Sequence, residues 1–184
     1  MARAARRVAA GLALSVAGLV HAAPLGDGAA LAGATLAIPV AGVAAAQLRD
    51  TFAESRAAGR KHEAIDIAAP TGTPVYAVED GNVAKLFNSV RGGRTVYQFD
   101  KQRRIAHYYA HLDRYAPGLR EGMALRRCDL IGYVGVTGNS RADAPHLHFA
   151  VFRLGPLKQW WVGEPLNPYP ALMAGAAAGV SCPR

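Results

Sequence analysis

The sequence predicts an all-β domain built mainly from antiparallel strands. After Asp66, short runs of β-branched and aromatic residues follow one another closely, and most end at turns rich in Gly, Pro, Asn or Asp. This pattern is typical of an antiparallel sheet or sandwich. No stretch after Asp66 has the periodicity of a helix longer than three turns, and neither an internal repeat nor a second domain is visible.

The expected strands can be placed in order from the turns that bound them. A Pro-Thr-Gly-Thr-Pro turn at 70–74 precedes the first strand of this series, and Asp-Gly-Asn at 80–82 ends it. Two later runs flank the polar turn 100–103 and form a hairpin. The expected strands cover residues 75–78, 83–87, 95–99, 105–109, 130–134 and 147–154.

Length and charge narrow the class of protein. A chain of 184 residues can bury a sizeable core in one domain. The net charge is +8, of which Arg3, Arg6 and Arg7 contribute three charges near the N-terminus. The remaining basic balance fits an anionic polymer as partner. Nucleic acid is not the expected partner, because the sequence has no basic helix, no aromatic–basic interleaving and no nucleic-acid module.

Residues 1–22 are predicted to be a secretory signal. A basic start is followed by the apolar run 8–20 and by a small-residue cleavage site that ends at Ala22. The run is shorter than the about 20 residues that a membrane span needs, and an uncleaved anchor is the alternative. We expect export, most simply to the periplasm, with secretion as a second destination.

The rest of the chain divides into a linker, a domain and a tail. The Ala/Gly-rich residues 23–46 are expected to be a linker, residues 47–170 the domain, and residues 171–184 a C-terminal tail. Cys128 and Cys182 are the two cysteines, and an oxidising compartment would let them pair and hold the tail on the domain. Without a Cys-x-x-Cys motif, zinc-ribbon and thioredoxin interpretations have no support.

Histidines at i and i+2 in the last strand indicate a metal site. His146 and His148 point to one face of a strand, with Cα atoms about 6.6 Å apart. His62 and Asp66 add ligands that suit zinc. Two structural histidines on a buried face are the alternative, which the upstream pair weakens. The residues alone do not decide whether His146 or His148 is the ligand.

The spacing of the upstream pair predicts a bend. On a regular strand, His62 and Asp66 would lie about 13 Å apart, too far to share a tetrahedral ion with bonds of roughly 2 Å. We therefore expect a bulge or loop between them. His111, at the end of a hairpin strand, is a third candidate. His107 has the same strand parity and could line the same face, although a structural role is the preferred expectation.

Four segments occur in the order that one enzyme family shows. They are HEAIDIAAPTGTPVYAVEDGNV at 62–83, HYYAHLDRY at 107–115, CDLIGYVGVTGNS at 128–140 and APHLHFAV at 144–151; WWVGEPLNPYP near the end resembles the tail of many members. The sequence thereby resembles the lysostaphin-type, LytM-like zinc metalloendopeptidases that cut peptide bonds in bacterial peptidoglycan. The resemblance implies a compact β-sandwich or duplicated hybrid motif, with the metal in a groove across the sheet.

The resemblance also implies the site. One zinc ion per chain would be held by His62, Asp66 and His148, and His111 and His146 would be the catalytic pair. Zinc lowers the pKa of a bound water to about 7. One catalytic histidine would take the water's proton during attack on the scissile carbonyl, and the other would stabilise the oxyanion. The implied partner is a peptidoglycan peptide, and the protein is expected to be a monomer.

Two departures from the family pattern concern the surroundings of this site. The family usually has glycine where Ala64 stands, so we expect a slightly reshaped bend, because alanine tolerates a positive φ poorly. The loop 140–144 is longer than the commonest form and is expected to alter a wall beside the site. Glu63 follows a ligand histidine, but the motif is not His-Glu-x-x-His and an extended chain points Glu63 away from His62.

Three rival functions fit parts of the pattern. A non-enzymatic regulator of another cell-wall hydrolase typically lacks some zinc or catalytic residues, whereas all five are present here. A sugar-transport phosphocarrier would need cytosolic phosphoryl donors, which an exported protein does not meet. A passive zinc-binding or peptidoglycan-binding module would leave His111 and His146 without a role. The zinc endopeptidase is therefore preferred, with the regulator as the alternative.

Overall fold

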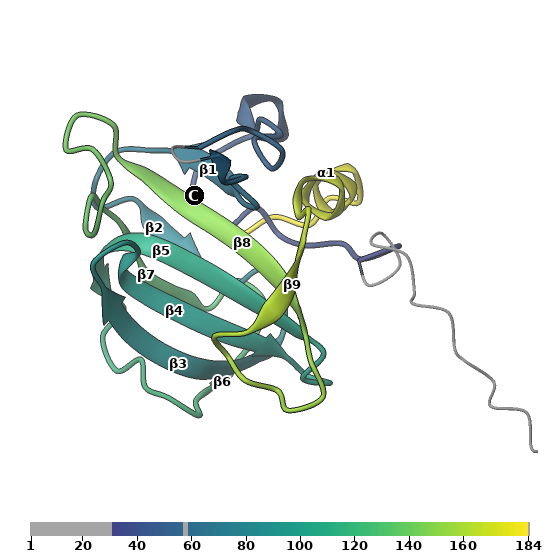
Figure 1. Cartoon of the computed structure of the whole chain (residues 1–184). Helices are drawn as coiled ribbons and strands as arrows, with labels where there is room; N and C mark the ends of the chain where they lie inside the picture. The colour runs from purple at the N-terminus through teal and green to yellow at the C-terminus, as the bar shows by residue number, and fades with distance from the viewer. Residues whose placement is uncertain (1–30, 57–58, 184) are drawn as a thin grey trace, which may run out of the picture.

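A computed structural model describes residues 31–56 and 59–183 (Figure 1). The predicted signal, 1–22, lies outside the described residues. The elements are a short 3-10 helix η1 (Ala45–Gln47), nine strands and one α-helix: β1 (Ile65–Ala68), β2 (Pro74–Tyr76), β3 (Gly81–Ser89), β4 (Gly93–Asp100), β5 (Ile105–Tyr115), β6 (Ala124–Leu125), β7 (Leu130–Val134), β8 (His146–Leu154), β9 (Gly163–Leu166) and α1 (Tyr169–Ala177).

The nine strands form one open sheet in which every pairing is antiparallel. The main order is β1-β8-β5-β4-β3-β6, and β9 pairs with β8. The sheet branches at β5, because its second half, from Leu112 onward, pairs with β7, which in turn carries β2. The predicted antiparallel all-β class is thus confirmed, and its hydrogen bonds run through one branched sheet rather than two separate sheets.

The expected strands are present, and several are longer than their apolar runs. The hairpin predicted around 100–103 is formed by β4 and β5, and β5 continues to Tyr115. The first expected strand, 75–78, is the short β2, whose register shifts after Val75. Propensity marks where a strand is favoured, but the partner strand decides where its hydrogen bonds stop.

The stretch expected to be a linker contributes to the core in its described part. Leu36, Ala37 and Val40 are buried, and backbone hydrogen bonds join Ala37 to Val78 and Tyr76 to Pro39. Residues 31–46 therefore pack beside β2 and α1 instead of only leading into the domain. The sequence does not predict this packing, because a segment rich in alanine and glycine shows little apolar periodicity.

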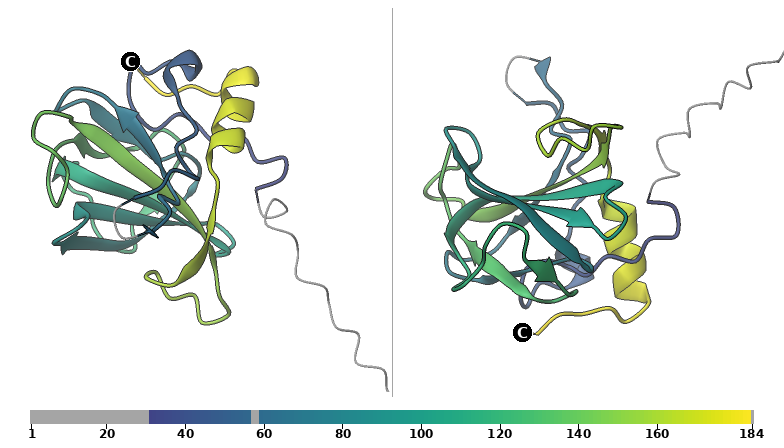
Figure 2. Two further views of the ribbon diagram at one scale, coloured as in Figure 1. Left: turned by 45° about the horizontal axis from the view of Figure 1, so that its top comes forward. Right: turned by 90° about the horizontal axis from the view of Figure 1, so that it is seen from below.

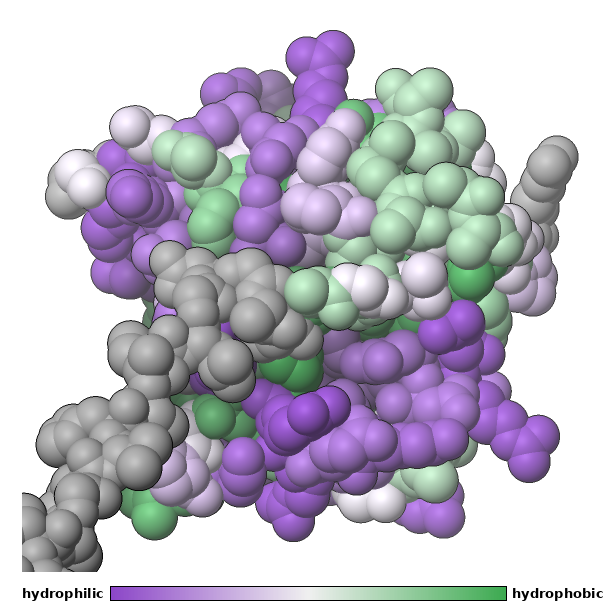
Figure 3. Space-filling view, turned by 90° about the vertical axis from the view of Figure 1, so that its right-hand side faces the viewer, coloured by the Kyte–Doolittle hydropathy of each residue, from purple (hydrophilic) through white to green (hydrophobic). Residues whose placement is uncertain are grey.

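The tail expected at 171–184 begins inside α1. Leu172 of this helix is fully buried in the main core. A side chain at Gly175 would collide with the carbonyl oxygen of Leu36, so the helix lies directly on the N-terminal segment. On the side shown in Figure 3, apolar side chains gather at the upper right, and hydrophilic ones lie to their left and below. Among the described residues, no helix is both long and apolar enough to cross a membrane.

A disulfide closes the C-terminal end of the fold. Cys128 and Cys182 are bonded, with Cα atoms 5.1 Å apart and a sequence separation of 54. We expect reduction, or Cys128→Ser with Cys182→Ser, to lower the free energy of unfolding by about 4 kcal/mol, because a long loop loses its cross-link in the unfolded chain. Urea unfolding with and without reductant measures this, and an unchanged midpoint would contradict it.

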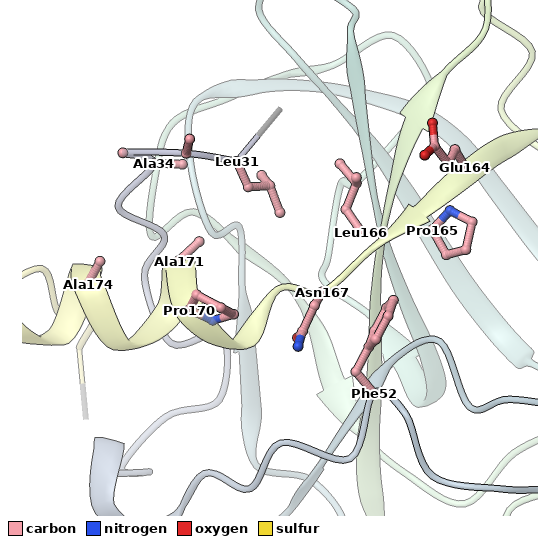
Figure 4. A pocket seen from close by; sticks show the side chains of 12 residues that line it. Leu31, Ala34, Phe52, Glu164, Pro165, Leu166, Asn167, Pro170, Ala171 and Ala174 are labelled. Carbon is pink, nitrogen blue, oxygen red and sulfur yellow. The ribbon is translucent and has the colours of Figure 1, made fainter. Parts of the chain in front are cut away.

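A groove of about 690 Å³ lies between the N-terminal segment, β9 and α1. Leu31, Phe52, Leu166 and Ala171 line it, together with other small residues, two prolines, Glu164 and Asn167 (Figure 4). None of the five predicted site residues borders this groove. These five residues instead gather around the start of β8, with His62 in the segment before β1.

Candidate metal centre and histidine pair

A residue in the left-handed backbone conformation makes the bend that the sequence predicts between His62 and Asp66. Glu63 has a φ of 56°, and the amides of His62 and Glu63 donate to the carbonyl oxygens of Glu54 and Phe52. This turns the chain directly before β1. Ala64 does not have a positive φ and is fully buried. Alanine is therefore accommodated at this position, and the strain falls on Glu63.

Strand register places Asp66 opposite His148. The two residues are direct partners in the β1–β8 ladder. Nδ1 of His148 lies 3.0 Å from Oδ1 of Asp66, and Nε2 of His62 lies 3.0 Å from the same oxygen. Nε2 of His62 and Nδ1 of His148 are 3.1 Å apart. The three side chains therefore point three ligand atoms at one place.

This donor set fits a zinc ion. Two imidazole nitrogens and one carboxylate oxygen converge, and ligands about 2.0–2.1 Å from a tetrahedral ion would stand roughly 3.3 Å apart, close to the distances observed. His62 Nδ1 lies 3.0 Å from the carbonyl oxygen of Thr51. A carbonyl can only accept, so Nδ1 carries the proton and the Nε2 lone pair is left for a metal. Three protein ligands leave a fourth position for water or substrate.

Asp66 is held as a carboxylate. Partial burial acts to raise its pKa, but hydrogen bonds from His148 and His62 outweigh burial and hold the pKa well below its usual range. The second carboxylate oxygen, Oδ2, accepts a hydrogen bond from Nη2 of Arg56 at 2.6 Å. Arg56 thus fixes the carboxylate so that Oδ1 faces the two histidines. Sequence reasoning missed Arg56, since an arginine six residues before a ligand has no distinctive spacing.

We expect Arg56→Gln to weaken zinc affinity by about 10-fold to 100-fold, because partners that orient a ligand typically contribute that much. Competition with a chromophoric chelator measures the change. Arg60→Gln is the matched control, since Arg60 is an exposed arginine of the same segment. Equal affinities for the two variants would show that Arg56 does not orient the ligand.

A β-bulge brings His111 to the face that carries the metal ligands. Between Tyr109 and Leu112 the strand β5 has one residue more than β4, and His111 there has a φ of 62°. Its ring centroid lies 5.0 Å from that of His146 and 5.7 Å from that of His148. The bulge reverses the alternation of side chains at this point.

His107 lies on the opposite side of the sheet. Without the bulge, alternation along β5 would put His111 on this same side. The side chain of His107 is fully buried. Its Nε2 lies 2.6 Å from Oε1 of Glu79, and its ring stacks on Phe149. The structure thus does not bring His107 to the candidate centre, and its contacts are those of a core residue.

His111 and His146 present matching nitrogen atoms. Nδ1 of each lies 2.8 Å from a backbone carbonyl oxygen, of Thr137 and Ala144 respectively. Both Nδ1 atoms therefore carry the proton, which leaves both Nε2 atoms able to accept one. Nε2 of His146 is 3.7 Å from Oδ1 of Asp66. The pair thus lies directly beside the ligand atoms.

Burial lowers the pKa of His111 to about 4, with the neighbouring His148 and His146 acting in the same direction. His111 is therefore neutral at pH 7. In the metal-free protein, His111 of the unfolded chain binds a proton below about pH 6.5, whereas His111 of the folded chain binds it only below about pH 4. We expect stability to fall as pH drops through this window. Urea unfolding at several pH values, compared with His111→Gln, measures this; an equal loss in both proteins would contradict it.

The remaining predicted neighbours lie at the edge of the site. Glu63 is exposed beside His62. In the loop 140–144, Arg141 and Asp143 form an exposed ion pair, and Ser140 Oγ lies 3.5 Å from Nδ1 of His146. Tyr108, which the sequence did not single out, has its ring centroid 6.1 Å from that of His148, with the two rings nearly perpendicular.

Known proteins share both the sequence and the fold. Residues 60–168 match Peptidase family M23. The L-Ala–D-Glu endopeptidase of Bacillus subtilis is 31% identical over 134 residues, which cover 68% of this chain and 39% of that protein. The DD-carboxypeptidase/endopeptidase Mpg of Neisseria meningitidis is 36% identical over 110 residues, 59% of this chain and 22% of that protein.

A solved structure of LytM from Ruminococcus gnavus superposes with a TM-score of 0.66 and 26% identity, over 82% of this chain and 64% of that one. This chain covers 39% and 22% of the two relatives named above, so it spans well under half of the length of each. The family match itself covers more than half of the chain and includes all five histidine and aspartate residues of the centre. The chain belongs to Peptidase family M23, with a LytM-type fold.

Proposed function

We propose that the chain is a zinc-dependent endopeptidase that hydrolyses peptide bonds in bacterial peptidoglycan. The observation that carries this proposal is the convergence of His62, Asp66 and His148 on one point, directly beside a second histidine pair. The names of the two relatives support the reaction, since both are endopeptidases, and one of them names a bond to a D-amino acid, D-Glu. They differ in the bond that their names imply, so the bond cut by this chain has to be measured.

In this proposal His62, Asp66 and His148 hold the metal. When bound, zinc supplies Lewis acidity, which lowers the pKa of water to about 7 and polarises a carbonyl group. The chain itself orients this centre: Thr51 fixes the tautomer of His62, and Arg56 fixes the carboxylate of Asp66. These contacts keep the ligand atoms in place without a change of conformation.

The histidine pair supplies proton transfer and charge stabilisation. The free Nε2 of His111 or of His146 accepts the proton of the attacking water, and the other ring stabilises the oxyanion of the tetrahedral intermediate as an imidazolium, the form in which its Nε2 also carries a hydrogen to donate. The proton held by the first histidine then goes to the leaving amine. Both rings are anchored through Nδ1 to backbone carbonyls, which keeps each Nε2 directed at the reacting groups.

A regulator of another cell-wall hydrolase is the second candidate function. It shares the fold and needs no complete catalytic set. The two oriented Nε2 atoms beside the ligand cluster favour the enzyme, because a binding role gives them no function. We further propose that the protein is exported, acts in the periplasm or outside the cell, and is a monomer. The disulfide between Cys128 and Cys182 supports an oxidising location.

The test uses purified protein with isolated peptidoglycan. Released fragments are identified by mass spectrometry, with His148→Ala as the negative control. We expect new amino termini within stem peptides or cross-links, and their masses identify the bond. Zinc binding without cleavage would favour the regulator, and cleavage by His148→Ala at the rate of the unaltered protein would contradict the proposed centre.

A further inference from the structure

A continuous row of aromatic rings leads away from the metal centre across the sheet. It starts beside His148 and crosses from β5 to β4 and on to β3. The β8–β9 connection contributes two tryptophans, one that joins the rings of β4 and β3 and one at the far end. The aromatic row consists of Tyr108, Tyr97, Trp160, Phe87 and Trp161. Ring centroids lie 4.7 Å apart for Tyr108–Tyr97 and 4.8 Å apart for Tyr97–Trp160, and Trp160 then contacts both Phe87 at 5.3 Å and Trp161 at 5.2 Å.

The row lies on the same face of the sheet as the ligand cluster. The ring of Tyr108 meets the ring of His148 edge-on, and its centroid lies 6.4 Å from that of Phe152. His148 and Phe152 belong to one face of β8. In the right-hand view of Figure 2, the blue segment that precedes β1 and the olive β8–β9 connection rise on the same side of the sheet. A polymer bound at the metal centre can therefore extend along the row.

The far end of the row is open to solvent. Trp161 is 59% exposed and Phe87 is 41% exposed. Large apolar residues of the β8–β9 connection, Leu157 and Val162, are exposed as well. Exposed aromatic residues that adjoin one another mark a binding surface more often than single exposed apolar residues do. Rings in contact with each other also present flat, rigid faces at little cost in conformational entropy.

We propose that the aromatic row is a sugar-stacking subsite, which holds an N-acetylhexosamine of the glycan while the attached peptide reaches the metal centre. This inference rests on the proposed function, because it concerns the same substrate. A pyranose presents a face of C–H groups with slight positive charge, and the face of an aromatic ring is negative, so the two faces attract each other. The peptide part of the substrate has no pyranose ring and therefore no comparable face of C–H groups.

The dimensions suit a sugar joined to the cleaved peptide. From β8 to β3 there are three strand spacings, roughly 15 Å. An extended peptide covers this distance with about four to five residues. A sugar at the far end of the row is thus within reach of a short peptide whose bond is held by His111, His146 and the metal ligands.

The experiment compares two substrates that share the same peptide. Disaccharide peptides are prepared from peptidoglycan with a muramidase, and a portion is treated with an amidase that removes the sugars. The unaltered protein is compared with Trp161→Ala and with Trp161→Phe, which keeps a ring. Leu157→Ala is the matched control, because Leu157 is an exposed apolar residue of the same connection that has no aromatic ring.

We expect Trp161→Ala to raise KM for the disaccharide peptides about fivefold to tenfold with kcat unchanged, the loss expected for one stacked ring. Trp161→Phe restores most of the affinity, and Leu157→Ala changes neither constant. The sugar-free peptides are cut equally by all four proteins. An equal rise in KM for both substrates, or no rise for either, would overturn the subsite.

A direct binding measurement separates this inference from the proposed function. If the protein cuts neither substrate, the proposed function fails, and the indole N–H signals are followed by NMR while the N-acetylglucosamine–N-acetylmuramic acid disaccharide is added. Shifts at Trp161 and Trp160 would support the subsite, and unchanged signals would overturn it. Binding to anionic phospholipid vesicles that Trp161→Ala and Leu157→Ala weaken equally would instead identify a membrane surface and overturn it too.

Discussion

Replacing His148 by alanine is expected to remove zinc and to lower peptidoglycan cleavage at least about 10³-fold, because a catalytic metal supplies several kcal/mol of transition-state stabilisation. Asp66→Ala is expected to do the same. Both side chains provide an atom of the ligand cluster, and the remaining two donors cannot define a tetrahedral site. Zinc content is measured by mass spectrometry of the metal, beside the rate of fragment release.

Glu63→Gln is the control for these variants. Glu63 is exposed and neighbours His62 in sequence, and it follows a ligand as the base of a His-Glu-x-x-His enzyme does. In this fold it is expected to change the rate less than twofold, a value about the size of ordinary surface effects. Full zinc content in Asp66→Ala would contradict the assignment of ligands, and a large loss of activity in Glu63→Gln would contradict the exclusion of Glu63 from catalysis.

Replacing His111 or His146 by alanine is expected to separate metal binding from catalysis. Neither side chain belongs to the ligand cluster, so zinc content should stay that of the unaltered protein. The rate should fall about 10²-fold to 10⁴-fold, the usual contribution of proton transfer by a positioned side chain. The double variant should lose little more than the single ones, because the two residues act in the same steps.

His107→Gln is the matched control for the pair. His107 belongs to β5, as His111 does, but its side chain lies in the core against Glu79. It is expected to lower thermal stability while the folded protein keeps its rate. Loss of zinc in His146→Ala would show that His146 is a ligand. A rate unchanged by His111→Ala would exclude His111 from proton transfer.

The parts of the site that depend on strand alternation could be predicted from sequence. His146 and His148 share a face of β8, as i and i+2 spacing requires. The bend before β1 followed from the distance between His62 and Asp66 on an extended chain. The choice of His148 over His146 depends on the register that puts Asp66 opposite His148, and one strand alone holds no information about its partner's register.

The parts that depend on backbone irregularity and on small residues could not be predicted. His111 reaches the site through a bulge that places an extra residue in β5, and parity alone put it with His107. Arg56 touches Asp66 because the segment before His62 folds back. The contribution of residues 31–46 and of α1 to the core rests on alanine and glycine, whose pattern does not distinguish a packed segment from a linker.

The dependence of peptidoglycan cleavage on bound zinc tests the central claim most directly. Metal is removed with a chelator, zinc is added back in known amounts, and fragment release is followed at each step. We expect cleavage to be absent without metal, to rise in proportion to zinc and to reach its maximum at one ion per chain, with no recovery in His148→Ala. Full cleavage by the metal-free protein would contradict a zinc centre formed by His62, Asp66 and His148.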